Sequence, residues 1–280
     1  MKILLTAKNS FVSRPLYPFL LECGYEVDAF SHQELDLTDI NALRPVLDNG
    51  DYDFVINPAI AGQGRILKED SLDDFYNNLL MNENLLFLKD AYGKLITFSS
   101  GAGNNRQQDI INLREHEVTI PPRNRYSLAK YICNRRIEHL PNVTNLRIFN
   151  LFGPLERQDR FISTAIRNYI NKKDIEIWGD AYFDFFGIND FLTVIRHILS
   201  FADNNYSELN LVYKEKTTLS LIAGIINGRD EHKVNIKIVP GINKHYYGSG
   251  FKLSRIGLPF LGLEKEIENM YQHLMNEKNN

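Results

Sequence analysis

The chain has 280 residues, of which 44% are hydrophobic and 24% charged, and its net charge is −3. A chain of this length can bury a substantial core without disulfides or a metal, and its two distant cysteines fit a reducing compartment. The balanced charge argues against nucleic acid or an anionic membrane as a partner. Because no apolar stretch approaches a membrane span or a signal sequence, we expect a cytoplasmic protein.

Short apolar runs and helical patterns alternate over roughly the first half of the chain. Apolar residues spaced three and four apart predict helices between the runs. Strand and helix in this rhythm predict right-handed crossovers, and so a doubly wound parallel sheet of the Rossmann-like α/β class. Ligands of such sheets bind at the carboxyl ends of the strands. The predicted strands are 3–6, 27–30, 54–57, 95–99 and 146–149, and the predicted helices are 16–23, 40–47, 73–90 and 127–139.

The rhythm breaks after Gly153 and Pro154, where aromatic and irregular segments follow. We therefore predict that residues 1–151 form the sheet domain, with a return to it near 183–202. Residues 152–280 are predicted to form mainly a smaller, irregular domain.

Tyr126 and Lys130 are four residues apart on a predicted helix, so their side chains share one face. A protonated Lys130 there lowers the pKa of Tyr126 from its ordinary value of about 10. A phenol tuned in this way can exchange a proton with a substrate near neutral pH. Ser99 and Ser100 end the preceding strand, and a hydroxyl at that place can bond the same substrate oxygen. The spacing alone also fits a surface tyrosine beside a solvated lysine.

These residues occur in the order and spacing of a known family. The first strand with its turn, the strand-end serines, Tyr126-Ser-Leu-Ala-Lys130 and Leu146-Arg-Ile-Phe-Asn-Leu-Phe-Gly-Pro154 resemble the extended short-chain dehydrogenase/reductases. That family comprises nucleotide-sugar epimerases, dehydratases and 4-keto reductases. Residues 24–39 and 257–266 are most similar to its dTDP-4-dehydrorhamnose reductase branch.

The resemblance implies a first domain that binds NADP or NAD, a second that binds a nucleotide sugar, and two copies that can pair as a homodimer. It implies that Tyr126 is the general acid, that Lys130 tunes it and anchors the cofactor ribose, and that Ser100 bonds the substrate oxygen. Asn78 has a counterpart in the family, although the sequence fits an ordinary asparagine on a helix surface equally well. Trp178 can contact the substrate or fill the core of the second domain. Cofactor contacts are implied for Ala7, Lys8, Asn9, Ser10, Phe11, Val12, Ser31, His32, Asp36, Leu37, Ala59, Ile60, Ala61, Asn78, Ser99 and Phe149, and substrate contacts for Asn150, Arg160 and Trp178.

The first turn departs from the family pattern. The glycines that let a backbone approach a pyrophosphate are replaced by Ala7, Ser10 and Ser13. A positive φ at any of them would be costly, although Lys8, Asn9 and the following helix N-terminus still favour a pyrophosphate. Two outcomes are open: an active enzyme, or a non-catalytic relative with a weakened cofactor site.

Substitutions elsewhere bear on the cofactor and the reaction. Ser31 and His32 follow the second strand in place of an acid that would repel a 2′-phosphate, which favours NADP. Gly101 and Ala102 replace the Asp–Glu pair of the dehydratases, so elimination of water lacks its acid–base couple.

Phe183 stands where the family often has an arginine for the diphosphate, and Arg147, Arg157 and Arg160 are the candidates to compensate. We expect NAD(P)H-dependent reduction of a nucleotide-linked 4-keto-6-deoxysugar. A non-catalytic relative and a C4 epimerase are the alternatives. The epimerase must retain its cofactor, which a weakened phosphate turn disfavours.

Overall fold

The computed structural model describes residues 1–62, 71–117, 120–200 and 206–279. The chain folds into two compact units. Residues 148–151 and 183–200, which were predicted from the sequence to belong to the sheet domain, lie in the second unit, whereas residues 206–209 belong to the first. The first unit comprises Met1–Asn105, Val118–Arg147 and Asp203–Leu209, and the second comprises Arg106–Glu117, Ile148–Ala202 and Asn210–Asn280.

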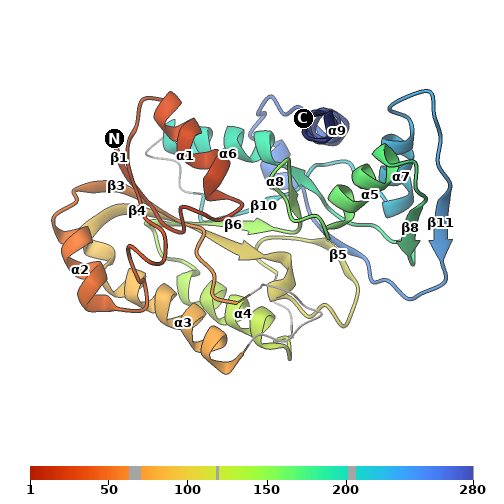
Figure 1. The fold of residues 1–280 in the computed structure, drawn as a ribbon. Coiled ribbons are helices and arrows are strands. Elements are labelled where there is room, and N and C mark those ends of the chain that lie inside the picture. Colours follow the sequence, from red (N-terminus) through yellow and green to blue (C-terminus); the bar gives the residue numbers. More distant parts are fainter. Residues whose placement is uncertain (63–70, 118–119, 201–205, 280) are drawn as a thin grey trace. The chain divides into compact units, whose positions relative to one another are not determined.

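A six-stranded sheet in the order β10-β6-β4-β3-β1-β2 is the centre of the fold (Figure 1). β1 pairs in parallel with both β2 and β3, and β3 pairs in parallel with β4. The predicted Rossmann-like parallel sheet is therefore confirmed. Its strands are β1 (Lys2–Leu5), β2 (Glu26–Ala29), β3 (Tyr52–Asn57), β4 (Tyr92–Ser100), β6 (Val143–Ile148) and β10 (Glu208–Leu211).

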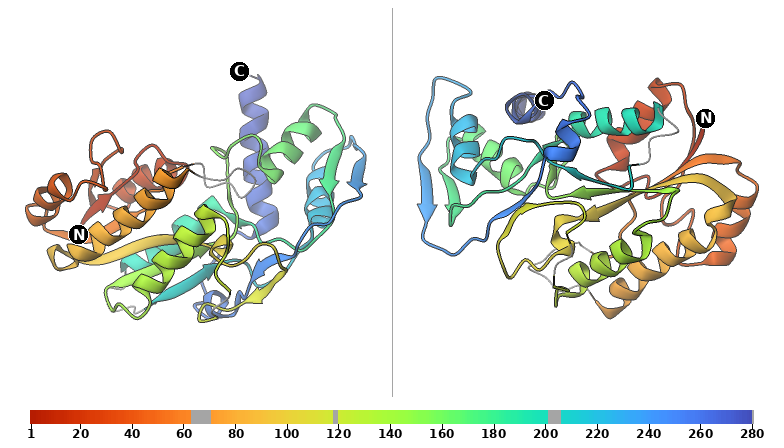
Figure 2. Two further views of the ribbon diagram at one scale, coloured as in Figure 1. Left: turned by 90° about the horizontal axis from the view of Figure 1, so that it is seen from below. Right: turned by 180° about the vertical axis from the view of Figure 1, so that it is seen from behind.

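Helices cover both faces of this sheet in the first unit. Figures 1 and 2 show α3 and α4 side by side on one face and α1 on the other. A buried apolar cluster that includes Leu43, Leu47, Leu85 and Val143 packs helices against strands. The helices of this unit are α1 (Ser13–Glu22), α2 (Ile40–Asp48), α3 (Leu72–Phe87) and α4 (Arg125–Ile137), with single 3-10 turns η1 (Lys89–Ala91) and η2 (Gly101–Gly103).

The second unit combines short strands with helices of 4 to 17 residues. Its core packs α5, α7 and α9 together, with Tyr169, Ile222 and Met270 fully buried. Three two-stranded sheets pair β8 with β11, β5 with β12, and β7 with β9. The elements are β5 (Ile110–Leu113), β7 (Leu151–Phe152), α5 (Phe161–Ile170), β8 (Ile175–Trp178), β9 (Phe186–Gly187), α6 (Ile188–Ser200), α7 (Leu219–Asn227), β11 (Ile236–Val239), β12 (Tyr246–Gly248), α8 (Phe251–Ser254) and α9 (Leu263–Asn279).

Candidate functional site

The turn after β1 has a glycine-like conformation, although Ala7 stands at its first glycine position. Ala7 has a φ of +48°, in the left-handed region that an L-residue adopts only under strain. The Ser10 amide donates to the Ala7 carbonyl at 2.8 Å, and the Lys8 amide donates to the Phe30 carbonyl at 2.9 Å. The backbone strain anticipated from the sequence is therefore present at Ala7.

Ser10 and Ser13 replace the other two glycines with hydroxyl groups that hold the turn together. The Ser10 hydroxyl oxygen accepts from the Ser13 amide at 3.1 Å, and it donates to the Ser13 hydroxyl at 3.1 Å. Ser13 is fully buried, and its hydroxyl donates to the Thr6 carbonyl at 3.1 Å. These bonds let α1 begin earlier than predicted, because Ser10 satisfies an amide of its first turn.

A cavity of about 560 Å³ opens beside this turn in the first unit. Its volume is in the range of small-molecule sites. It gathers the turn after β1, the loops after β2 and β3, and part of α3. The predicted cofactor residues that line it are Ala7, Asn9, Ser10, Ser31, His32, Asp36, Leu37, Ala59, Ile60 and Ala61; the lining residues that the sequence analysis missed are Leu35, Thr38, Pro58, Asn77 and Met81.

Lys8, Phe11 and Val12 do not line this cavity. The Lys8 ammonium lies 5.6 Å from the centroid of the Tyr17 ring. Within the described part of the chain, the Phe11 and Val12 amides donate to no acceptor, as is usual where a helix begins. An anion at this N-terminus would accept hydrogen bonds from them.

Asn78 and Asn84 are buried on α3 and hold two loops of the cavity. Asn78 accepts from the Ala61 amide at 3.1 Å and donates to the Ala61 carbonyl at 3.0 Å. Asn84 donates to the carbonyls of Leu37 and Thr38 at 2.8 and 3.0 Å. Both side chains therefore fix loops that line the cavity of about 560 Å³, a positioning role that was not predicted from the sequence.

The loop after β2 carries carboxylates of its own. Glu34 accepts a hydrogen bond from the Ser31 amide at 2.7 Å, and this bond lowers the pKa of Glu34. Asp36 accepts from the amide and the hydroxyl of Thr38 at 2.8 and 2.7 Å. An anionic group thus lies next to Ser31 even though Ser31 and His32 are not acidic. Glu34 was not predicted from the sequence, because it lies three positions beyond its partner Ser31 and no motif links the two.

Tyr126 and Lys130 lie on α4, in its first and second turns. The Asn124 side chain caps this helix by accepting from the Ser127 amide at 2.9 Å. Ser100 ends β4, and its hydroxyl oxygen accepts from the Ala102 amide at 3.1 Å. The following turn, η2, packs on α4: a Cβ on Gly103 would lie 3.6 Å from the Lys130 Cβ. The predicted trio is therefore carried by two elements in contact, with no carboxylate at Gly101 or Ala102.

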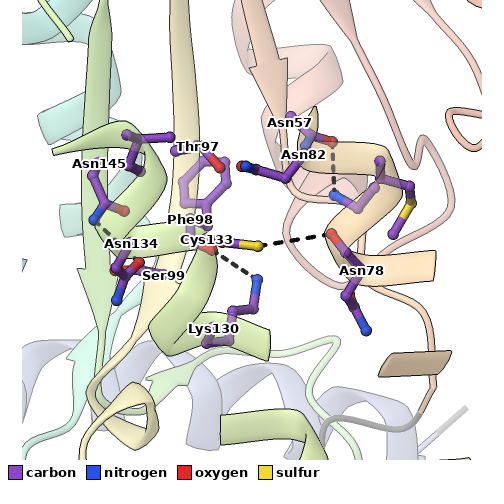
Figure 3. Close-up of a pocket in the computed structure, with 13 residues that line it drawn as sticks. Asn57, Asn78, Asn82, Thr97, Phe98, Ser99, Lys130, Cys133, Asn134 and Asn145 are labelled. Atoms are coloured by element: carbon purple, nitrogen blue, oxygen red, sulfur yellow. Dashed lines mark hydrogen bonds between the residues drawn. The ribbon is translucent and has the colours of Figure 1, made fainter. Parts of the chain in front are cut away.

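Lys130 reaches into a small polar cavity beneath α4 (Figure 3). Its ammonium donates to the Phe98 carbonyl at 3.0 Å, and burial lowers the pKa of Lys130. The cavity holds about 20 Å³, which is enough for one water. Among the described residues, three buried polar atoms of its lining lack a hydrogen-bond partner, namely Ser99 Oγ, Asn82 Nδ2 and Asn145 Oδ1.

Asn150 and Arg160, the predicted substrate residues of the second unit, are neighbours. The Arg160 guanidinium donates to the Asn150 side-chain oxygen at 3.4 Å, and it lies 3.5 Å from the Glu156 carboxylate. Burial raises the pKa of Glu156 to about 8, although Arg160 opposes the shift. Asn150 also donates to the backbone carbonyl of Asp184 at 2.8 Å.

Phe149 and Trp178 have different surroundings. Phe149 is buried in the second unit, with its ring centroid 4.9 Å from that of Tyr246. Trp178 ends β8 and is 68% exposed. Trp178 therefore does not fill the core, and its indole is available to a ligand.

The three arginines that were candidates to compensate for Phe183 all have carboxylate partners. Arg147 is buried and paired with Glu208 at 2.5 Å, whereas Arg157 pairs with Asp159 at 3.1 Å. Arg160 pairs with Glu156, as described above. An anionic ligand would have to compete with these carboxylates.

No helix in the described part of the chain has the length and apolar composition of a membrane span. The family model described as the NAD dependent epimerase/dehydratase family matches residues 3–211. No curated protein gives a significant match.

Similar solved structures cover nearly the whole chain. One is UDP-glucose 4-epimerase with UDP-glucose from Thermotoga maritima, with a TM-score of 0.81 and 18% identity over 99% of this chain and 100% of that one. Another is dTDP-4-dehydrorhamnose reductase with NADP from Bacillus anthracis, with a TM-score of 0.78 and 17% identity over 98% of each chain. A third is dTDP-glucose 4,6-dehydratase with NAD, also from Bacillus anthracis, with a TM-score of 0.77 and 17% identity over 100% of this chain and 98% of that one. At these identities the likeness shows the fold alone.

Proposed function

The chain belongs to the NAD dependent epimerase/dehydratase family, and we propose that it reduces a nucleotide-linked 4-keto-6-deoxysugar with NADPH or NADH. The family assignment made from the sequence is confirmed, and with it an enzyme class that uses a nicotinamide cofactor. The observation that carries the specific reaction is the contact between η2 and α4. Ser100 directly precedes η2, and Tyr126 and Lys130 belong to α4. The sequence has no carboxylate at position 101 or 102.

The first unit fits a dinucleotide in two respects. The cavity of about 560 Å³ has the loops after β1, β2 and β3 as its walls, where a doubly wound sheet binds such a ligand. Ala7 keeps the left-handed turn, and the Phe11 and Val12 amides remain available to a pyrophosphate. Ser31, Asp36 and Ala59 would hold the adenosine half. When bound, the cofactor supplies the hydride for C4.

The chain's own residues supply the proton and the orientation. Tyr126 donates its proton to the oxygen that forms at C4, and Lys130, one helical turn away, favours the phenolate that remains. The Ser100 oxygen already accepts from the Ala102 amide, so its hydrogen can be donated to the same substrate oxygen. Asn150, Arg160 and Trp178 are the proposed substrate contacts in the second unit.

Tyr126→Phe tests the proton transfer. Removal of the phenolic proton should lower kcat by at least about 100-fold, while the Kd for NADPH stays nearly unchanged. Tyr131→Phe is the matched control, because Tyr131 lies on the same helix without a proposed role. Turnover should be followed as oxidation of NADPH with dTDP-linked and UDP-linked 4-keto-6-deoxysugars. Undiminished turnover by Tyr126→Phe would exclude this mechanism.

NADP is the cofactor we favour, because Ser31 and His32 replace the acid that would repel a 2′-phosphate. The Glu34 carboxylate at the Ser31 amide opposes that preference. Titration of the protein with NADPH and NADH measures it directly. Tighter binding of NADPH in the wild type, and a further gain in Glu34→Gln, are the expected results.

The strained Ala7 supports a second hypothesis, a non-catalytic relative with a weakened cofactor site. The same titrations separate the two. Micromolar binding would dismiss the non-catalytic hypothesis, and no binding at millimolar cofactor would make it the better one. A C4 epimerase is a third hypothesis, and it predicts that NAD stays bound to the purified protein during turnover.

A further inference from the structure

Arg106 lies over a buried aromatic ring in the second unit. Its guanidinium carbon lies 3.8 Å from the centroid of the Tyr246 ring and 5.4 Å from that of Phe183. Tyr246 is almost fully buried, and Phe149 packs against it at 4.9 Å. Because the Tyr246 ring is buried and packed, it gives the guanidinium a rigid support.

The charge of Arg106 has no counterpart within the described residues. No carboxylate there pairs with its guanidinium, and its Nε is buried without a hydrogen-bond acceptor. Asp109, which follows on the same segment, accepts instead from the His245 amide at 2.8 Å. A buried donor on a charged group is costly to leave unpaired. The side chain as a whole is half-buried, and its charge can therefore be neutralised by an anion from outside the chain.

The other cations around these rings are already neutralised. The Lys216 ammonium lies 2.9 Å from the buried Asp184 carboxylate, and Arg160 is paired with Glu156. Arg255 is also stacked on a ring, but that ring belongs to Phe251, which is 66% exposed. Arg106 differs from Arg255 because burial has removed part of its water, which strengthens its attraction for an anion.

We propose that Arg106 binds the diphosphate of the nucleotide-linked substrate. A planar guanidinium matches the paired oxygens of a phosphoryl group. Tyr246 and Phe183 support that guanidinium from below. The assignment rests on the proposed function for the identity of the substrate, but the anion site itself is defined by Arg106 and its rings. A sugar carboxylate has the same chemistry, so the test includes one.

The experiment measures binding of dTDP, UDP, inorganic pyrophosphate, thymidine and glucuronate by calorimetry. Arg106→Ala should weaken diphosphate binding by about 10- to 100-fold and flatten its dependence on salt. Thymidine binding should not change. Arg255→Ala, the matched stacked arginine, should bind every probe as the wild type does. Thermal melting and NADPH titration check that each variant is folded.

A second variant moves the charge. Because Phe183 lies 5.4 Å from the Arg106 guanidinium carbon, the exchange Arg106→Phe with Phe183→Arg keeps one cation and one ring in the same contact. It should recover part of the diphosphate affinity that Arg106→Ala loses. Failure of this exchange to bind better than Arg106→Ala would count against a site defined by charge.

The outcomes separate this inference from the proposed function. Equal diphosphate binding by the wild type and Arg106→Ala would overturn the inference, even if 4-keto sugars are reduced. Loss of glucuronate binding alone would overturn it in favour of a carboxylate site. Arg106-dependent diphosphate binding without turnover of any 4-keto sugar would support the inference while the proposed reduction fails.

Discussion

The Lys130 ammonium donates a hydrogen bond to the Phe98 carbonyl oxygen, 3.0 Å away. This bond ties α4 to β4 just before the strand ends at Ser100. It holds a cation in a place where burial disfavours the charge and lowers the pKa of Lys130. A buried charged group that lowers the stability of the fold is characteristic of a functional site.

Lys130→Met should therefore separate stability from activity. Loss of the cation should lower kcat by at least about 100-fold, because Tyr126 loses the charge that tunes it. The variant should nevertheless unfold at higher urea concentration at pH 7, because the buried charge is gone. As the pH rises from the lowered pKa of Lys130 toward its ordinary value, the unfolded wild type binds more protons than the folded one, so wild-type stability increases. The advantage of Lys130→Met should thus shrink as the pH rises toward the ordinary value of 10.5. A less stable variant at pH 7 would contradict this account.

Ala7→Gly should stabilise the turn after β1 and strengthen cofactor binding. Glycine adopts the φ of +48° without strain, so the free energy of unfolding should rise by up to about 1 kcal/mol. Loss of the Cβ should also let the pyrophosphate approach, and so lower the Kd for NADPH. Asp51 has the same φ of +48° between α2 and β3, which makes Asp51→Gly the matched control. It should gain stability with an unchanged Kd, and an equal change in Kd for both variants would refute the role of Ala7.

Glu156 should make stability depend on pH. The folded chain holds its proton up to a pKa of about 8, whereas the ordinary value is 4.5. Between these values the folded state binds more protons, so stability falls as the pH rises, by at most about 1.4 kcal/mol per unit. Glu156→Gln cannot lose this proton and should show a flatter profile, with its largest advantage above pH 8. Urea unfolding from pH 5 to pH 9 measures the profile, and the half-buried Glu268 gives the control Glu268→Gln, which should retain the wild-type slope.

Asp184 and Lys216 should behave as a coupled buried pair. Asp184 also accepts from the Gly248 amide at 2.7 Å, and burial raises the pKa of Asp184 to about 6 despite Lys216. Asp184→Asn leaves a desolvated ammonium without its partner and should cost about 3 kcal/mol. Adding Lys216→Met should cost less than the sum of the two single changes. Additive losses in urea unfolding would show that the ion pair contributes nothing of its own.

Much of the first unit could be predicted, because its strands are apolar runs and its helices have a clear three-and-four spacing. β10 was missed, since Glu208 and Asn210 interrupt its apolar run while the sheet still pairs it with β6. Residues 148–151 were assigned to the sheet domain because they continue β6 in sequence. Phe149 instead packs against Tyr246, a partner from a distant segment that no local pattern identifies.

The sequence predicted many residues of the candidate site, but it did not predict which groups their side chains contact. The family resemblance singled out Asn78, yet only the folded chain shows that its side-chain amide bonds both backbone groups of Ala61. Glu34 was passed over because a helix-like turn brings it back to Ser31. Arg106 was missed for a related reason: nothing near it in sequence indicates the ring of Tyr246 beneath it.

The hydroxyl bonds of Ser10 and Ser13 have a consequence for hydrogen exchange. Since the Ser13 amide is already bonded to Ser10, its deuterium uptake should be slow before any nucleotide is added. The amides of Phe11 and Val12 should exchange quickly until a pyrophosphate accepts from them. Slow exchange at Ser13 therefore reports that the turn is held by its own side chains. Slow exchange at Phe11 and Val12 reports that the turn has bound its ligand.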